Sequence, residues 1–279
     1  MKIVHTLPQP EKVFPDGQFR LDMWYDYAAA ISPELPVKCA EDSAGYDFMN
    51  DVLPVIDQAL GSPDAWQELN ASFGRAADML AEAAPALYGC DPDVQVILYL
   101  GLCSGAGWAT ELDGKPAILL GIEKIIELGW QGEQDMKGLI CHELGHLWHR
   151  FAGRQALPED SAEERAVAQL YDEGVAMRCE QRLCGDDAFF HQDKHGWAAF
   201  CETHLADMRA DYLTRMQRGD STQDFFGDWV RWQGQPDVGY YLGCDFIRRL
   251  EERLAFDVIA RMGYRDIRAE MITYLSQPG

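Results

Sequence analysis

A single β-rich block interrupts a chain whose other segments mostly have helical periodicity. Residues 94–102, VQVILYLGL, are continuously apolar and rich in β-branched residues, which is typical of a strand buried on both faces. The segments GWATEL and KPAILLGIE follow, joined by Asp113-Gly114, a pair that favours a two-residue hairpin turn. A small sheet is therefore predicted shortly before the motif HELGH at residues 142–146.

Helices are predicted on both sides of this block. KIVHTL at the N-terminus is expected to add a short strand, whereas apolar residues in 64–89 recur every three or four positions up to Gly89, a helix stop. Residues 161–185 begin with Ser161 and Glu164 at the spacing of a capping box and end at Gly185. The predicted fold class is α+β. Residues 1–155 form a subdomain with a small mixed sheet and the HELGH helix, and residues 156–279 form an all-helical subdomain.

The charge balance argues against two kinds of partner. The 279-residue chain has 46 acidic and 24 basic residues, which gives a formal net charge of −22. Nucleic acids and anionic membranes repel such a surface, so neither is expected as a partner. The hydrophobic content of 47% is that of a globular chain, and nothing in the composition specifies an oligomeric state.

Targeting signals are not recognised in the sequence. The apolar run in MKIVHTLPQPEKVF is too short for a signal peptide, and no stretch approaches the roughly 20 apolar residues of a membrane span. The eight cysteines are scattered without C-x-x-C pairs, which favours reduced, buried thiols over a disulfide framework. A cytoplasmic location is expected, and secretion without a recognisable signal stays open.

The stretch LICHELGHLWHR, residues 139–150, carries the clearest chemistry. Its surroundings have helical periodicity, with Asp135 predicted as the N-cap. On a helix, His142 and His146 lie on one face, one turn apart, so both imidazoles can bind one zinc ion at about 2.0–2.1 Å. Glu143 then lies beside the metal, where its carboxylate can take a proton from a zinc-bound water. This spacing is the H-E-x-x-H signature of metalloproteases.

The third ligand decides whether this is a catalytic site, a structural metal site or a helix that happens to carry histidines. A third histidine six residues beyond His146 is absent, because Ala152 stands there. Glu173, in LYDEGVAM, follows after 26 intervening residues, and the loop AGRQALPED lets a second helix run back antiparallel. Gly174 predicts a close approach of the two helices, since a helical glycine costs about 1 kcal/mol relative to alanine and needs a packing reason.

The elements His142-Glu143-x-x-His146 and Glu173-Gly174-x-Ala176 resemble the gluzincins, the superfamily of thermolysin-like and aminopeptidase-N-like zinc metallopeptidases. The resemblance covers residues 139–177 and extends to GYYLG, residues 239–243, which is similar to the G-Y-x-x-G segment of bacterial predicted zinc-dependent proteases. It implies a thermolysin-like zincin architecture, zinc held by two histidines and Glu173, and Tyr240 as the group that stabilises the tetrahedral intermediate. The spacing between the second histidine and Glu173 is longer than in thermolysin, and the aminopeptidase G-A-M-E-N element is absent.

Other residues near the motif have open assignments. His149 is a third ligand in place of Glu173, a hydrogen-bond partner of a ligand, or a partly exposed residue, and the non-ligand roles are favoured. Asp172 either binds a ligand imidazole or is a solvated surface residue. Cys141 projects about 100° away from His142 and is interpreted as a core thiol. The other histidines lack ligand spacing with the motif and are interpreted as ordinary polar residues: His5, His191, His195 and His204.

Two further features bear on the substrate. Tyr240 and Tyr241 are adjacent, so on a helix only one of them can face a cleft. In the gluzincin fold an edge strand binds extended peptide, and either WATEL or KPAILLG could serve, with Pro116 suited to an edge position because it lacks an N–H.

The preferred interpretation is a zinc metallopeptidase that acts on a peptide or protein substrate. His142, His146 and Glu173 bind Zn²⁺ with water in the fourth position, Glu143 is the general base, and Tyr240 is the oxyanion donor. Two alternatives stay open, a binding or regulatory protein with a structural or vestigial zinc site and a zinc hydrolase of non-peptide amides.

Overall fold

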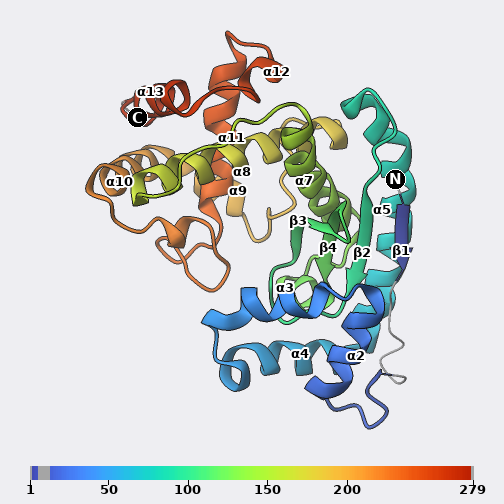
Figure 1. Ribbon diagram of the computed structural model, residues 1–279. Coiled ribbons are helices and arrows are strands. Elements are labelled where there is room, and N and C mark those ends of the chain that lie inside the picture. Colours follow the sequence, from blue (N-terminus) through green and yellow to red (C-terminus); the bar gives the residue numbers. More distant parts are fainter. Residues whose placement is uncertain (1, 6–12, 278–279) are drawn as a thin grey trace. The chain divides into compact units, whose positions relative to one another are not determined.

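The computed structural model describes residues 2–5 and 13–277, and these residues form a mixed α+β protein that is mostly helical (Figure 1). Contacts within the chain divide it into two compact units, Met1–Leu144 and Gly145–Gly279. The described strands all lie in the first unit, and the described elements of the second unit are helical. The predicted α+β class, with a sheet in the first half and helices in the second, is confirmed.

One four-stranded sheet lies in the first unit, with the strand order β1-β2-β4-β3. β2 pairs in parallel with β1 and with β4, whereas β3 pairs antiparallel with β4. The sheet is therefore small and mixed, as predicted. The strands are β1 (Lys2–His5), β2 (Gln95–Tyr99), β3 (Gly107–Leu112) and β4 (Lys115–Gly121).

The hairpin between β3 and β4 forms where the sequence predicted it. Asp113 and Gly114 have φ values of 52° and 71°, so both lie in the left-handed region that a type I′ turn requires. Of the two segments considered for an edge strand, WATEL belongs to β3, which is an edge, and KPAILLG forms β4, which lies between β2 and β3. Pro116 is therefore in an internal strand. It is tolerated because β2 first pairs with the next residue, Ala117.

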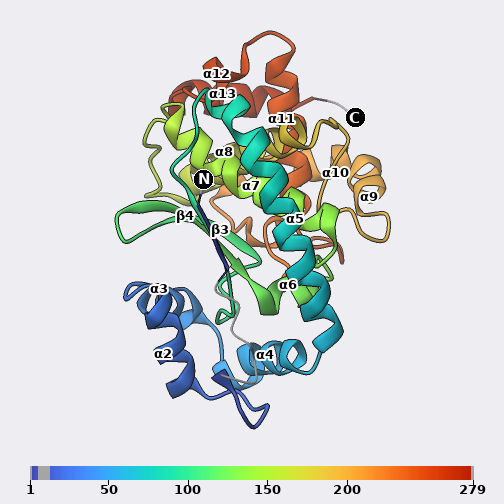
Figure 2. The ribbon, with the colours of Figure 1, turned by 90° about the vertical axis from the view of Figure 1, so that its right-hand side faces the viewer.

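The helices of the first unit surround a core that includes Trp24, whose buried indole N–H donates to the Leu100 carbonyl at 2.8 Å. Helix α5 has proline at its first position and ends at Gly89, where φ is 70°. Figure 2 shows this long helix beside the strands. The helices are α2 (Leu21–Ile31), α3 (Leu35–Asp42), α4 (Leu53–Leu60), α5 (Pro63–Tyr88), α6 (Ile122–Leu128) and the first part of α7 (Glu133–Phe151), with η1 (Ser43–Gly45) and η2 (Phe48–Val52) between α3 and α4.

The second unit is built around α8, which contacts α10, α11 and α13. Residues 197–218 have helical periodicity throughout but form two helices, because the chain bends at His204 and the His204 ring stacks on Phe200. The helices are α8 (Ala162–Cys184), α9 (Trp197–Thr203), α10 (Leu205–Arg218), α11 (Val238–Glu251), α12 (Phe256–Ile259) and α13 (Tyr264–Leu275), with η3 (Gln223–Phe225) after α10.

In the part of the chain that the structure describes, no helix is both long enough and apolar enough to span a bilayer.

Candidate metal centre

Helix α7 presents the residues of the HELGH motif. It begins at Glu133, so Asp135 is not the N-cap but lies within the first turn, where a carboxylate stabilises the positive end of the helix dipole. The hydroxyl of Tyr88, at the end of α5, donates to the carbonyl of Leu144 at 2.7 Å. The side chain of Arg75 on α5 also binds Glu133. These two contacts hold the motif-bearing helix against α5.

Helix α8 supplies Glu173. The helix starts at a full capping box, in which Ser161 and Glu164 each bind the other's backbone N–H, and it stops at Gly185 with φ of 74°, as predicted. Contacts between α7 and α8 run in opposite order along the two helices: His149 meets Tyr171, and His146 meets Glu173. The two helices are therefore antiparallel, which is the arrangement that the sequence predicted.

The glycine that brings α7 and α8 together is Gly145 rather than Gly174. A Cβ at Gly145 would lie 2.9 Å from the Cα of Ala176 and 2.8 Å from the Cβ of Cys179. A Cβ at Gly174 would lie 2.4 Å from the carbonyl oxygen of Gly243, on α11. The packing reason expected for Gly174 exists, but it is the crossing of α8 and α11. The signal for Gly145 was present in the motif itself, as the glycine of HELGH.

His142, His146 and Glu173 form a group that can hold a metal ion, called here the ligand group. Each offers one ligand atom, and these atoms all lie within 4.8 Å of one another. His142 is buried, and the side chains of His146 and Glu173 are each 18% exposed. A buried imidazole with two partly accessible ligands suits an ion that is fixed by the protein and still reached by solvent.

The distance between two of the ligand atoms fits a tetrahedral ion. Nε2 of His146 and Oε2 of Glu173 are 3.3 Å apart. Two atoms at about 2.0–2.1 Å from a tetrahedral zinc would be about 3.3 Å apart, whereas a charge-assisted hydrogen bond brings nitrogen and oxygen to about 2.7–2.9 Å. Two imidazoles and one carboxylate are also a donor set that zinc accepts, with a fourth position left over.

Glu143 is buried beside the edge strand of the sheet. A Cβ at Gly107, the first residue of β3, would lie 2.9 Å from Oε1 of Glu143 and 3.0 Å from a methyl carbon of Leu139. The side chain of Glu143 therefore occupies the space that any other residue at position 107 would fill. The absence of a side chain at Gly107 lets the β3 backbone approach this carboxylate, and the sequence did not indicate this role.

His149 makes an internal hydrogen bond and is not a member of the ligand group. It is buried, and its Nε2–H donates to the carbonyl of Ala260 at 3.1 Å. Burial, with the nearby positive charge of Arg154, lowers the pKa of His149 to about 3. The contact of its Nδ1 with Asp172, at 3.4 Å, is therefore between a neutral ring and a carboxylate. Of the roles considered for His149, the one the structure shows is an internal hydrogen bond between α7 and the end of α12.

Asp172 is bound by Arg154 rather than solvated. The guanidinium donates through Nε to Oδ1 at 2.7 Å and through Nη2 to Oδ2 at 2.5 Å. Burial raises the pKa of Asp172, and the hydrogen bonds and charge of Arg154 oppose that rise. The imidazole closest to Asp172 belongs to His149 and not to the ligand group.

The G-Y-x-x-G segment forms the start of α11, and its two glycines have packing roles. A Cβ at Gly239 would lie 2.5 Å from the ring of Phe226, and Gly243 faces the backbone of Gly174. Tyr241 stacks on Phe190, and burial raises its pKa to about 12. Tyr240 is half-buried, with its ring edge-on to Phe226 at 5.8 Å. Tyr241 is thus a packing residue, and Tyr240 as oxyanion donor stays a prediction.

The sequence did not predict the buried pair of His191 and Glu180. His191, interpreted from the sequence as an ordinary polar residue, is 2% exposed, and its ring Nδ1 and backbone N–H both lie 2.9 Å from the carboxylate of Glu180. His191 lies beyond Cys184, the last residue of α8, so no helical periodicity relates it to Glu180 and nothing in the sequence pointed to the pair.

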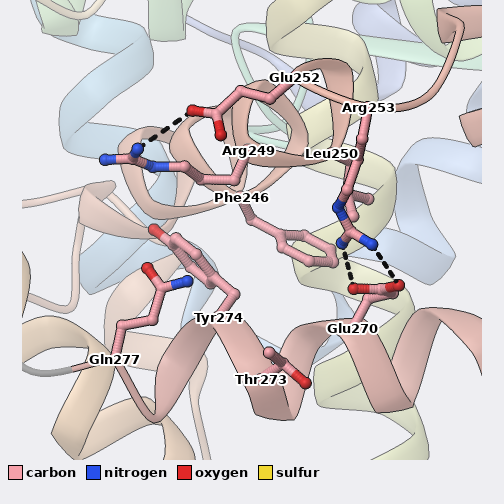
Figure 3. A pocket seen from close by; sticks show the side chains of 9 residues that line it. All are labelled: Phe246, Arg249, Leu250, Glu252, Arg253, Glu270, Thr273, Tyr274 and Gln277. Atoms are coloured by element: carbon pink, nitrogen blue, oxygen red, sulfur yellow. Dashed lines mark hydrogen bonds and ion pairs between the residues drawn. The ribbon is translucent and has the colours of Figure 1, made fainter.

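A separate hollow of about 270 Å³ lies between α11 and α13, with Phe246 and Tyr274 among its lining residues (Figure 3). Its charged groups already form two ion pairs, Arg249 with Glu252 and Arg253 with Glu270. None of the ligand group lines it, and its paired charges select no ligand.

Comparison with known proteins identified no relative of this chain. No protein-family model, curated protein or solved structure matches this chain.

Proposed function

We propose that this chain is a zinc-dependent peptidase of the gluzincin type, with a thermolysin-like arrangement of its catalytic helices. The observation that carries the proposal is the ligand group, two histidines one turn apart on α7 and Glu173 on the antiparallel α8, with ligand atoms within 4.8 Å of one another. Three protein ligands are the number found in catalytic zinc sites, whereas structural sites use four. This count favours catalysis over a structural or vestigial site.

Each residue of the candidate site has a proposed role. Zinc bound by the ligand group would lower the pKa of a coordinated water to about 7 and polarise a carbonyl oxygen. Glu143 follows His142 directly on α7 and is 5% exposed. Its proposed role is to accept a proton from that water and to deliver it to the leaving amine. Tyr240 is proposed as the hydrogen-bond donor to the developing oxyanion.

A peptide substrate is favoured over a small amide by the strand beside Glu143. β3 is an edge of the sheet, and its first residue, Gly107, lies against the Glu143 carboxylate. An edge strand offers backbone N–H and C=O groups to an extended chain, and this one would bring that chain to the general base.

The test is Glu143→Gln, compared with wild type for zinc content and for cleavage of an unbiased peptide library. The variant is expected to hold zinc like wild type and to cleave at least 10³-fold more slowly, a loss on the order of that found when a catalytic base or oxyanion donor is removed. Tyr240→Phe should lower kcat while leaving zinc content unchanged. A wild-type protein that holds zinc but cleaves no member of the library would contradict the peptidase proposal.

A further inference from the structure

Three consecutive residues of α8 contact α7 or the turn that follows it. The ring of Tyr171 is edge-on to His149 at 5.1 Å, Asp172 binds Arg154, and Glu173 lies against His146. Successive residues on a helix point about 100° apart, so Asp172 cannot share the metal-facing side with Glu173. Its carboxylate is instead directed to the C-terminal end of α7.

Hydrogen bonds hold both the backbone and the side chain of Arg154. Its backbone N–H donates to the carbonyl of His149 at 3.0 Å, which closes the last turn of α7. The residue before it, Gly153, has φ of 100°, a conformation that favours glycine, and this sends the chain back toward α8. The guanidinium then binds Asp172 through two parallel hydrogen bonds. One residue therefore joins the end of α7 to the position next to Glu173.

This connection restricts displacement of α8 along the axis of α7. A metal ligand must sit within about 0.2 Å of its ideal distance from the ion, whereas packed helices tolerate larger shifts. The two-point hydrogen bond of a guanidinium with a carboxylate fixes both distance and orientation, which a single hydrogen bond does not. The side chains of Arg154 and Asp172 are 22% and 23% exposed, so water screens their attraction only in part.

We propose that Arg154 and Asp172 form a clamp that positions Glu173 as the third ligand of the metal centre. Both are positioning residues, because they act through the backbone of α8 and not on the ion or the substrate. The proposal rests on the metal site proposed above, and it predicts that breaking the clamp weakens metal binding although all three ligands remain.

The test measures binding of Zn²⁺ alone to the metal-free full-length protein, by competition with a chromophoric chelator. Asp172→Asn keeps the shape of the side chain and removes its charge, and it is expected to bind Zn²⁺ about 10- to 100-fold more weakly than wild type. Arg154→Lys keeps the charge but not the two-point geometry, so it is expected to show a smaller loss in the same direction. Glu163→Gln is the matched control, because Glu163 lies at the start of α8 and pairs with Arg268 at 2.7 Å. It should bind Zn²⁺ as wild type does.

A second readout separates positioning from general loosening of the fold. The visible spectrum of bound Co²⁺ reports the number and geometry of its ligands. The Asp172→Asn spectrum is expected to move toward that of Glu173→Gln, while the Glu163→Gln spectrum stays at wild type. If Asp172→Asn does not fold, Arg154→Lys provides both readouts.

The outcomes separate this proposal from the one before it. Wild-type Zn²⁺ affinity and an unchanged Co²⁺ spectrum in both clamp variants would overturn the clamp and leave the metal site intact. A wild-type protein that binds Zn²⁺ but cleaves no peptide would overturn only the peptidase. A wild-type protein that binds no Zn²⁺ would overturn the metal site and the clamp together.

Discussion

At the scale of single residues, His149 shows how burial decides the chemistry of a histidine. It lies one turn beyond His146 and is of the same residue type, but it is 1% exposed and its Nε2–H is used by Ala260. Desolvation of the charged ring and the nearby Arg154 keep it neutral, with a pKa of about 3. Histidines three positions apart on one helix thus differ in role: His146 belongs to the candidate ligand group, and His149 makes an internal hydrogen bond.

This neutral histidine makes stability depend on pH. Its folded pKa of about 3 lies below the unfolded value of 6.5, so the unfolded chain binds the proton first as the pH falls. The contribution of His149 to the free energy of unfolding is fully present above pH 6.5 and is lost progressively as the pH falls toward 3. Between pH 7 and pH 5 the loss is about 2 kcal/mol.

Urea unfolding of metal-free wild type and His149→Gln, at pH 7 and at pH 5, measures this contribution. The variant is expected to be the less stable at pH 7 and to lose less stability than wild type on going to pH 5. The carboxylates common to both proteins cancel in this comparison. An identical pH dependence of the two proteins would show that His149 has the same pKa in the folded and unfolded states, which would contradict this prediction.

The residues of the candidate site could be predicted from the sequence because their constraint is local. His142, Glu143 and His146 occupy one helix, and Glu173 lies on the next, so helical periodicity and loop length were enough to bring them together. The partners of these residues could not be predicted in the same way. The carbonyl that binds His149 is 111 residues away, and the strand residue against Glu143 is in a sheet that precedes the helix. Such contacts depend on tertiary packing, which leaves no period in the sequence.

At the scale of the elements, two glycine-mediated contacts position the helices that carry the ligand group and Glu143. The first is the crossing of α8 and α11, where Gly174 meets Gly243. Gly174 directly follows Glu173 in the sequence. Gly174→Ala would introduce a Cβ at 2.4 Å from the carbonyl oxygen of Gly243, and a backbone atom cannot rotate away as a side chain does. The helices would have to separate.

Gly174→Ala is therefore expected to destabilise the protein by about 1–3 kcal/mol, although alanine by itself favours a helix by about 1 kcal/mol over glycine. Denaturant unfolding measures the change. Gly45→Ala is the control, because a Cβ there meets nothing within 4 Å and the residue has an ordinary negative φ, so its stability should stay near that of wild type. A Gly174→Ala protein as stable as wild type would contradict the close crossing.

The second contact is that of β3 with α7 at Gly107. Gly107→Ala would push against the Glu143 carboxylate at 2.9 Å, and this flexible group can move. The fold should survive, with the proposed general base displaced. We expect kcat/KM to fall about 10- to 100-fold, because a displacement of about 1 Å in a catalytic group can cost that much.

Zinc content and thermal stability should be nearly unchanged in Gly107→Ala, since the three atoms nearest to the new methyl group belong to Glu143 and Leu139 and not to the ligand group. Steady-state kinetics on a cleaved peptide, with zinc analysis and a melting curve for the same sample, checks this combination. A loss of zinc in parallel with activity would mean that β3 supports the ligands rather than the base.

The limits of sequence prediction are also visible at this scale. The hairpin at Asp113-Gly114, the capping box of α8 and the stops at Gly89 and Gly185 were all predicted, because each depends on a conformational preference of the residues themselves. The break at His204 was not predicted, since the apolar pattern continues through it and the bend depends on the stacking of His204 on Phe200. Gly174 was correctly expected to have a packing reason, but the expected partner helix, α7, was wrong, because Gly174 packs against α11.

At the scale of the whole molecule, a bound metal would link two helices that are otherwise held by side-chain contacts. The ligand group takes ligands from α7 and from α8, and the loop between the helices is long. An ion bound by the folded chain and not by the unfolded chain stabilises the fold by mass action. The melting temperature should therefore depend on the free metal concentration.

Removal of the metal with a chelator is expected to lower the stability of wild type by about 2.7 kcal/mol relative to protein at a free Zn²⁺ concentration of 100 times Kd. Melting curves with and without Zn²⁺ measure this increment, and adding Zn²⁺ back should restore it. Glu143→Gln alters the same helix without removing a ligand, so it should keep the full increment. Glu173→Gln should lose most of it, because Zn²⁺ would be held by two imidazoles only. An increment that survives in Glu173→Gln but disappears in Glu143→Gln would mean that Glu143 is a ligand and Glu173 is not, which would exchange the roles of the two carboxylates in the proposed mechanism.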